Sequence, residues 1–156
     1  MFPISHFNIT RTPFYYYDKT LLSNTLAKLI RLAGERNYHI HYAVKANANP
    51  EILKLIAASG IGADCVSGGE IKAALEAGFP AKKIVFAGVG KADWEIEYAL
   101  EKKIFCFNVE SAEELSVIEE LAKKKENIAS IALRINPNID AHTCLLYTSD
   151  AADEED

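Results

Sequence analysis

Five short β-rich runs alternate with helical patterns from residue 38 onward, and this alternation limits the possible folds more than any other feature of the sequence. The runs are HIHYAV (39–44), GADCVS (62–67), KIVFAG (83–88), IFCFNV (104–109) and SIALRI (130–135). They recur at intervals of 21 to 26 residues, which is the length of one strand–helix unit. Strands that are connected through helices pair in parallel, and parallel sheets are normally buried on both faces. The sequence therefore predicts an α/β protein with a parallel sheet that is covered on both faces.

The segments between the runs carry apolar residues at helical spacing, and their ends carry capping signals. Asn49-Pro50 offers an N-cap followed by a proline at the first helical position. The segments Ser67–Glu70 and Ser111–Glu114 both match the capping box. Gly60 and Gly78 are placed to end helices. These signals predict one helix after each of the first four strands.

Two parallel architectures fit this pattern, and the spacing alone does not choose between them. One is an open doubly wound sheet, and the other is a (β/α)₈ barrel of the TIM type. A complete barrel needs roughly 250 residues, whereas this chain has 156. If the fold is a barrel, the chain holds about the first five parallel strands and is a partial barrel.

Composition and charge argue against several functional classes. Hydrophobic residues make up 49% and charged residues 25% of the chain, as in ordinary globular proteins. The net charge of −5 arises from the acidic segment 150–156, because the remaining 17 acids balance the 17 bases. No basic cluster suggests a nucleic-acid or membrane surface. No export signal and no apolar stretch of 18 residues occurs, so we expect a cytoplasmic protein.

The three cysteines, Cys65, Cys106 and Cys144, are far apart and form no C-x-x-C pair. This spacing favours neither a disulfide framework nor a zinc site. His39 and His41 alternate on one strand, but no carboxylate or cysteine lies at ligand spacing from them, so no metal is expected.

Polar residues with possible chemical roles follow the strands, and in either architecture the carboxyl ends of parallel strands form the active site. Lys45 follows the first strand. Asp64 and Glu70 lie in and after the second strand, and Arg134 lies at the end of the fifth. Further polar residues and glycines at these ends are Ser67, Gly88, Gly90, Asn108, Glu110 and Asn136.

Each of these residues also has a purely structural explanation. A lone lysine at a strand end is more often a side chain that reaches to water, and this explains Lys45 as well. The capping box accounts for Ser67 and Glu70. Asp64 needs a partner if it is buried, and Ser67 or a backbone amide would suffice. Arg134 would serve as a structural ion-pair partner of Asp64 or Glu70.

A nucleotide-binding site is poorly supported by the loops. The GVG at 88–90 lacks the third glycine of a dinucleotide fingerprint, and KANANP after the first strand contains no glycine that would let the backbone surround a phosphate. A Rossmann-type function is therefore not favoured.

Six blocks together resemble the diaminopimelate decarboxylase family, which consists of pyridoxal-phosphate-dependent enzymes with an alanine-racemase-like barrel. In chain order the blocks are TPFYYYD (12–18), YAVKANANPEIL (42–53), GIGADCVSGGEIKAALEAG (60–78), VFAGVGKADWEIEYAL (85–100), FNVESAEEL (107–115) and LRINPNIDAHT (133–143). The resemblance covers residues 11 to 143 and implies an α/β fold of partial-barrel type without the family's C-terminal β-domain. It further implies a carboxy-lyase of lysine biosynthesis that converts meso-diaminopimelate to L-lysine and CO₂.

The resemblance also implies roles for four residues. Lys45 matches the lysine that forms a Schiff base with pyridoxal phosphate, and we expect an apolar strand end to desolvate its amine into the reactive, unprotonated form. Asp64, Glu70 and Arg134 match residues that line the cofactor pocket. We expect Glu70 and Arg134 near the ring, and Asp64 to orient Lys45.

For the rest of the chain, the resemblance predicts three parts. Residues 1–20 would join the β-domain, residues 21–143 form part of the barrel, and the acidic segment 144–156 departs from the family, as expected of an artefactual or truncated end. A small amino-acid substrate and, for the full-length protein, a homodimer are implied, whereas this chain alone is expected to bind the cofactor poorly and to be inactive. Alternatives within the same fold group are decarboxylases of ornithine, arginine, lysine or carboxynorspermidine, a racemase, and a non-catalytic barrel that binds pyridoxal phosphate.

Overall fold

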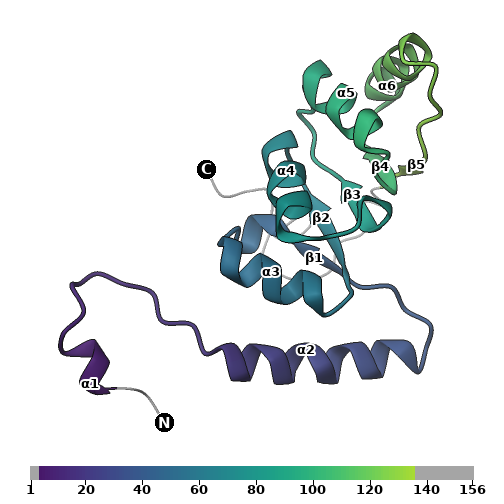
Figure 1. The fold of residues 1–156 in the computed structure, drawn as a ribbon. Helices are drawn as coiled ribbons and strands as arrows, with labels where there is room; N and C mark the ends of the chain where they lie inside the picture. The colour runs from purple at the N-terminus through teal and green to yellow at the C-terminus, as the bar shows by residue number, and fades with distance from the viewer. Residues whose placement is uncertain (1–3, 136–156) are drawn as a thin grey trace, which may run out of the picture. The chain divides into compact units, whose positions relative to one another are not determined.

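The computed structural model describes residues 4–135, which belong to two compact units that divide after Tyr38 (Figure 1). The first unit contains α1 (Ile4–Phe7) and α2 (Lys19–Gly34). Helix α2 begins at Asp18, whose carboxylate accepts a hydrogen bond of 2.9 Å from the Leu21 N–H. The second unit contains the sheet and the candidate site. The predicted segment 144–156, residues 136–143 and with them Asn136 lie outside the described residues.

The second unit is built on one sheet of five parallel strands, in agreement with the predicted fold class. The strands are β1 (His41–Ala43), β2 (Gly62–Cys65), β3 (Ile84–Phe86), β4 (Cys106–Val109) and β5 (Ile131–Leu133). Their spatial order follows their order in the sequence. A doubly wound sheet reverses its direction of growth at a switch point, whereas a barrel does not. The strand order therefore decides in favour of the partial barrel.

A helix follows each of the first four strands, as the capping signals predict. These helices are α3 (Pro50–Ala58), α4 (Gly68–Ala77), α5 (Asp93–Lys102) and α6 (Ala112–Lys124), with short 3₁₀ turns η1 (Val44–Ala46) and η2 (Ala81–Lys83). The side chains of Asn49, Ser67 and Ser111 accept hydrogen bonds from the first turns of α3, α4 and α6. Gly78 ends α4 in the left-handed conformation with φ of 100°. Consecutive helices pack against one another along the sheet (Figure 1).

The two faces of the sheet differ in burial. Cys65, Phe86 and Phe107 are paired in register and belong to one face, where their exposure is 2% or less. On the other face, Asp64 and Cys106 are half-buried, while Val85, which pairs with both, is 9% exposed. The described residues therefore meet the expectation that both faces are covered only in part. The described strands form an open sheet, so no strand packs across its inner face.

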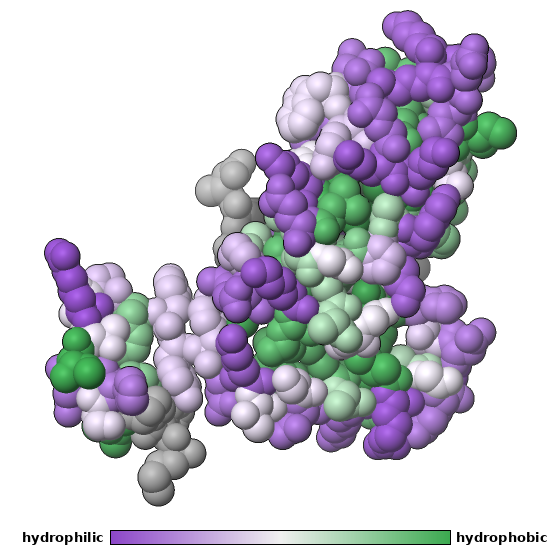
Figure 2. All heavy atoms as spheres, viewed as in Figure 1, coloured by the Kyte–Doolittle hydropathy of each residue, from purple (hydrophilic) through white to green (hydrophobic). Residues whose placement is uncertain are grey.

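The space-filling view shows hydrophilic side chains over α5 and α6 and apolar surface nearer the centre of the second unit (Figure 2). Strand β5 at the sheet edge exposes Ile131 and Leu133 by 40% and 64%. In the part of the chain that the structure describes, every helix falls short of the length and apolarity that crossing a bilayer requires.

Candidate functional site

Lys45 lies in η1, the turn that continues β1 at its carboxyl end. Two hydrogen bonds to Asn47 hold this turn. The Asn47 N–H donates to the Val44 carbonyl at 3.1 Å, and the Tyr42 hydroxyl donates to the Asn47 carbonyl at 3.1 Å. Val44 is completely buried and anchors the turn in the core. The sequence places Lys45 at the strand end, and the turn holds its backbone there.

The expectation that Lys45 is desolvated is wrong for the chain as described, because Lys45 is exposed. The turn lies at the rim of an open sheet, and among the described residues no strand faces it from across a barrel. The Lys45 side chain is therefore in contact with solvent. An exposed amine at this position can instead be reached by a ligand from solution.

Glu70 is the third residue of α4 and takes part in the helix cap, as its sequence suggests. Its backbone N–H donates to Ser67 Oγ at 3.2 Å, and its carboxylate accepts from the Val66 N–H at 2.8 Å. Burial raises the pKa of the Glu70 carboxyl, while the Val66 hydrogen bond lowers it. The negative charge of Asp64 raises this pKa further, and the positive charge of Lys45 lowers it. Glu70 thus takes part in the helix cap and also interacts electrostatically with two of the three other predicted site residues, Asp64 and Lys45.

Asp64 is a centre of negative charge on the inner face of the sheet. It pairs in register with Ala43 on β1 and with Val85 on β3. Burial lowers the pKa of His41, and the charge of Asp64 opposes this effect. Burial raises the pKa of the Cys106 thiol, and Asp64 raises it further. The charge of Asp64 on β2 therefore acts on His41 of the adjacent β1 and on Cys106 of β4, which lies beyond β3.

Arg134 follows β5 and is linked to the end of β4. Its backbone N–H donates to the Val109 carbonyl at 2.9 Å, and its Nη1 lies 3.1 Å from Oε2 of Glu110. Glu110 stands among the strand-end residues of the sequence, but as a partner of Arg134 it was not predicted. The sequence did contain a signal for this pair, because Glu110 and Arg134 directly follow the neighbouring parallel strands β4 and β5.

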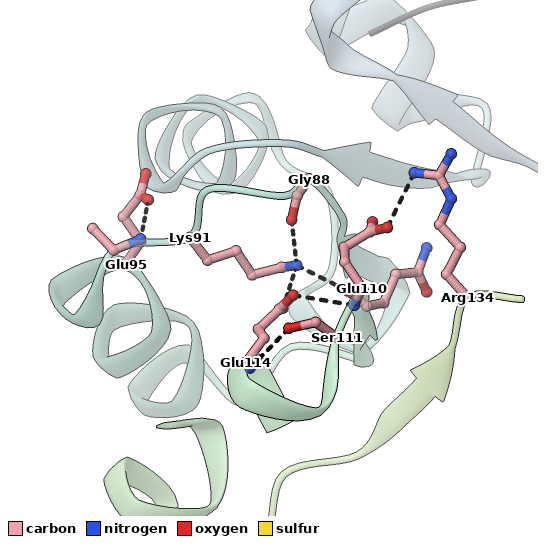
Figure 3. Close-up of polar contacts among 9 residues, drawn as sticks. Gly88, Lys91, Glu95, Glu110, Ser111, Glu114 and Arg134 are labelled. Atoms are coloured by element: carbon pink, nitrogen blue, oxygen red, sulfur yellow. Dashed lines mark hydrogen bonds and ion pairs between the residues drawn. The ribbon is translucent and has the colours of Figure 1, made fainter. Parts of the chain in front are cut away.

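Lys91, in the loop between β3 and α5, is a buried charged residue that the sequence analysis missed. Its side chain has 0% exposure, and its Nζ lies 2.6 Å from Oε1 of Glu114 on α6 (Figure 3). In the sequence it follows GVG and precedes a helix, where a lysine is usually solvated. Glu114 was interpreted as part of a capping box, so its second role was equally hidden.

The chemistry of these groups fits pyridoxal phosphate. An aldehyde requires a reachable primary amine, which Lys45 offers. The ring nitrogen and the phosphate require a carboxylate and a cation respectively. Glu70 and Asp64 are carboxylates after and in β2, and Arg134 is a cation after β5, so charges of both signs lie at or near the carboxyl ends of these strands. Among the described residues no cluster of three or more His, Cys, Asp or Glu could hold a metal ion, and His39 and His41 belong to none.

Comparisons with known proteins agree with this chemistry. The family model for the pyridoxal binding domain of pyridoxal-dependent decarboxylases matches residues 23–155. A diaminopimelate decarboxylase of Bacteroides thetaiotaomicron is 58% identical over 99% of this chain and 40% of its own length. One from Helicobacter pylori strain J99 is 49% identical over 88% of this chain and 34% of its own length. The match to the family model and the match to the Bacteroides enzyme both run past residue 143, where we expected the resemblance to end.

Solved structures give the same result. Diaminopimelate decarboxylase from Helicobacter pylori complexed with L-lysine superposes with a TM-score of 0.78 at 46% identity, over 90% of this chain and 36% of that one. The enzyme from M. jannaschii in co-complex with L-lysine gives a TM-score of 0.82 at 38% identity, over 90% of this chain and 34% of that one. The chain spans 40% or less of the length of these relatives. By the match of its sequence to the family model and of its sheet to these structures, the chain belongs to the pyridoxal-dependent decarboxylases and contains part of their pyridoxal binding domain.

Proposed function

We propose that the chain forms the cofactor-binding part of a decarboxylase that converts meso-diaminopimelate to L-lysine and CO₂. The observation that carries the proposal is the exposed Lys45 amine at the carboxyl end of β1, whose charge acts on Glu70 beside Asp64. The substrate is inferred from the relatives, which are diaminopimelate decarboxylases, two of them solved with L-lysine.

In this proposal, the charge of each described site residue determines its role. Pyridoxal phosphate, when bound, supplies an electron sink for the carbanion that remains after CO₂ leaves. Lys45 carries the cofactor through its amine and, once the substrate has replaced it, is free to hold a proton. Glu70 and Arg134 balance the charges of the cofactor. Asp64 keeps the Lys45 amine oriented through its negative charge.

Lys91 is the other lysine near the carboxyl ends of the described strands, and it is unsuited to carry the cofactor. Its Nζ donates to three acceptors, which are the carbonyls of Gly88 and Asn108 and the carboxylate of Glu114. An ammonium group has three donors, so all of them are used. An incoming aldehyde also needs access to the amine, which the side chain of Lys91, with 0% exposure, does not offer. Lys45 is therefore the site of attachment.

The attachment site is tested by incubating the chain with pyridoxal phosphate, reducing the mixture with borohydride, and locating the pyridoxyl group by peptide mass spectrometry. We expect Lys45 to carry most of the label and Lys45→Ala to lose it. Lys54→Ala is the control, because Lys54 is also exposed but lies on α3 in an ion pair with Glu51. Label spread evenly over surface lysines, unchanged in Lys45→Ala, would refute the assignment.

The activity is tested in a chimera in which residues 1–135 replace the matching part of the Bacteroides relative. We expect this chimera to release CO₂ from meso-diaminopimelate, and Lys45→Ala to lower the rate roughly 10³-fold. Lys54→Ala should leave the rate unchanged. The 156-residue chain alone is expected to release no CO₂. A chimera that is folded but inactive would contradict the proposal.

The proposal extends to the setting of the protein. Cys65 and Cys106 are free thiols, which agrees with a reducing cytoplasm. A homodimer for the full-length protein and the division into residues 1–20, 21–143 and 144–156 rest on the family resemblance. Sedimentation of the chimera tests the dimer.

A further inference from the structure

The side chain of Lys91 is buried and fully hydrogen-bonded at the carboxyl end of the sheet (Figure 3). Its Nζ donates to the Gly88 carbonyl at 2.7 Å, the Asn108 carbonyl at 2.8 Å and Glu114 Oε1 at 2.6 Å. The ammonium also lies 5.4 Å from the centre of the Phe86 ring. These contacts join the ends of β3 and β4 to the start of α6.

Glu114 connects Lys91 to the backbone of Glu110. Its Oε1 is held by Lys91, and its Oε2 accepts a hydrogen bond of 3.1 Å from the Glu110 N–H. The Glu114 N–H in turn donates to Ser111 Oγ at 3.1 Å. The carboxylate is therefore fixed through both oxygens, and the backbone at Glu110 is fixed with it.

Glu110 connects this cluster to Arg134. Its side chain is 10% exposed, and its Oε2 accepts from Arg134 Nη1 at 3.1 Å (Figure 3). The cluster thus contains two ion pairs, Lys91 with Glu114 and Arg134 with Glu110. Lys91 and Arg134 are thus the cations that pair with these two carboxylates.

We propose that Lys91 and Glu110 are positioning residues that set the guanidinium of Arg134 for the cofactor. The inference rests on the proposed function, in which Arg134 contributes to the cofactor site. A buried ion pair is rarely the most stabilising solution, since apolar side chains of similar volume often stabilise as much or more. A charged cluster at this position is therefore better explained by the geometry that it imposes on Arg134 than by stability.

The position of Arg134 can be measured without the cofactor, by the rate at which phenylglyoxal modifies its guanidinium. Peptide mass spectrometry follows Arg134 and, as an internal reference, Arg31, whose side chain is 64% exposed in an ion pair with Glu35 on α2. We expect Lys91→Met to raise the Arg134 rate roughly fivefold, the size typical of coupled neighbours. The Arg31 rate should not change.

Glu110→Leu keeps the test decisive if Lys91→Met fails to fold. Glu110 precedes the N-cap Ser111, a position where an apolar residue is tolerated well. The variant leaves the Lys91–Glu114 pair intact and should raise the Arg134 rate by a similar factor. Lys125→Met is the matched control, because it removes a lysine paired with Glu101 at the other end of α6.

A double-mutant cycle separates positioning from general stabilisation. If Lys91 acts on Arg134 through Glu110, Lys91→Met has no further effect in a Glu110→Leu background. Additive effects of the two substitutions, or an Arg134 rate unchanged in folded Glu110→Leu, would overturn the proposal.

The link to the cofactor is measured by borohydride capture of pyridoxal phosphate on Lys45. Capture should fall when Glu110→Leu is made in the wild-type chain. It should not fall further when the same substitution is made in Arg134→Met, because the residue that Glu110 positions is then absent. Capture unchanged by Glu110→Leu in the wild-type chain would overturn the proposal. A wild-type chain that captures nothing at Lys45 counts against the proposed function alone, since the phenylglyoxal rates still decide whether Lys91 and Glu110 hold Arg134.

Discussion

Lys91 Nζ and Glu114 Oε1 lie 2.6 Å apart, although 23 residues separate them in the sequence. The lysine comes from the loop after β3 and the glutamate from the first turn of α6. Both side chains are largely withdrawn from water, with exposures of 0% and 13%. This pair is therefore a contact of the tertiary structure, and its removal has consequences that differ from those of the surface pairs.

Replacing Glu114 by leucine should strongly destabilise the second unit. The substitution leaves a buried ammonium without its counter-charge, which typically lowers the free energy of unfolding by about 3–5 kcal/mol. Urea denaturation measures the loss. Glu119→Leu on the same helix is the control, because Glu119 and Lys123 form an exposed pair and its loss should be undetectable. Adding Lys91→Met to Glu114→Leu should restore much of the stability, and a double variant as unstable as the single one would argue against this explanation.

Glu70 should make the stability of the protein depend on pH in an unusual direction. Burial raises the pKa of its carboxyl above the ordinary value of 4.5, so the folded protein takes up this proton at a higher pH than the unfolded chain. The contribution of Glu70 to the free energy of unfolding therefore increases as the pH falls through the raised pKa toward 4.5. As the pH rises through the raised pKa, this contribution is lost. Urea midpoints between about pH 7 and about pH 5, compared between wild type and Glu70→Gln, test this sign. Parallel curves for the two proteins would contradict it.

The charges around Glu70 predict opposite effects of two substitutions on its pKa. Lys45→Ala removes the positive charge that lowers the pKa of Glu70, so this pKa should rise. Asp64→Asn removes the negative charge that raises it, so the pKa should fall. An NMR titration of the Glu70 carboxyl carbon measures both shifts. Two shifts of the same sign would show that the three residues do not form one electrostatic site.

Gly62 should not tolerate a side chain. A Cβ at this position would meet the ring of His41 and the Lys83 carbonyl, which lies 2.5 Å away and belongs to the backbone. Overpacking of this kind costs about 1–3 kcal/mol, and Gly62→Ala should lower the urea midpoint accordingly. Gly34→Ala on α2 provides the comparison, because no atom lies within 4 Å of the Cβ that it adds. Equal midpoints for the two variants would refute the packing argument.

Local signals allowed most of the fold to be predicted from the sequence. The strand runs, the caps at Asn49, Ser67 and Ser111, and the left-handed Gly78 depend on residues close in sequence, and all of them were confirmed. The strands are shorter than the predicted runs, as at β1, where the backbone turns into η1 already at Val44. Sequence spacing did not decide between a barrel and a doubly wound sheet. That choice required the spatial order of the strands.

The sequence placed the candidate site residues at the strand ends but did not predict their environment. Parallel strands bring many polar residues to one edge of the sheet, and the family resemblance singled out Lys45, Asp64, Glu70 and Arg134 among them. Their roles toward the cofactor remain a prediction. The exposure of Lys45 contradicts the expected desolvation, because burial depends on the strands that face it and not on the apolar residues that precede it.

The sequence by itself determined the alternation of strands and helices, the positions of the caps and the strand-end location of the polar residues, because these depend on neighbours within a few positions. Only the tertiary structure decided which charges meet. Lys91 joins Glu114 across 23 residues and Arg134 joins Glu110 across 24. Such pairs form where separate loops converge at the sheet edge, and the burial that strengthens them is a property of the assembled layers.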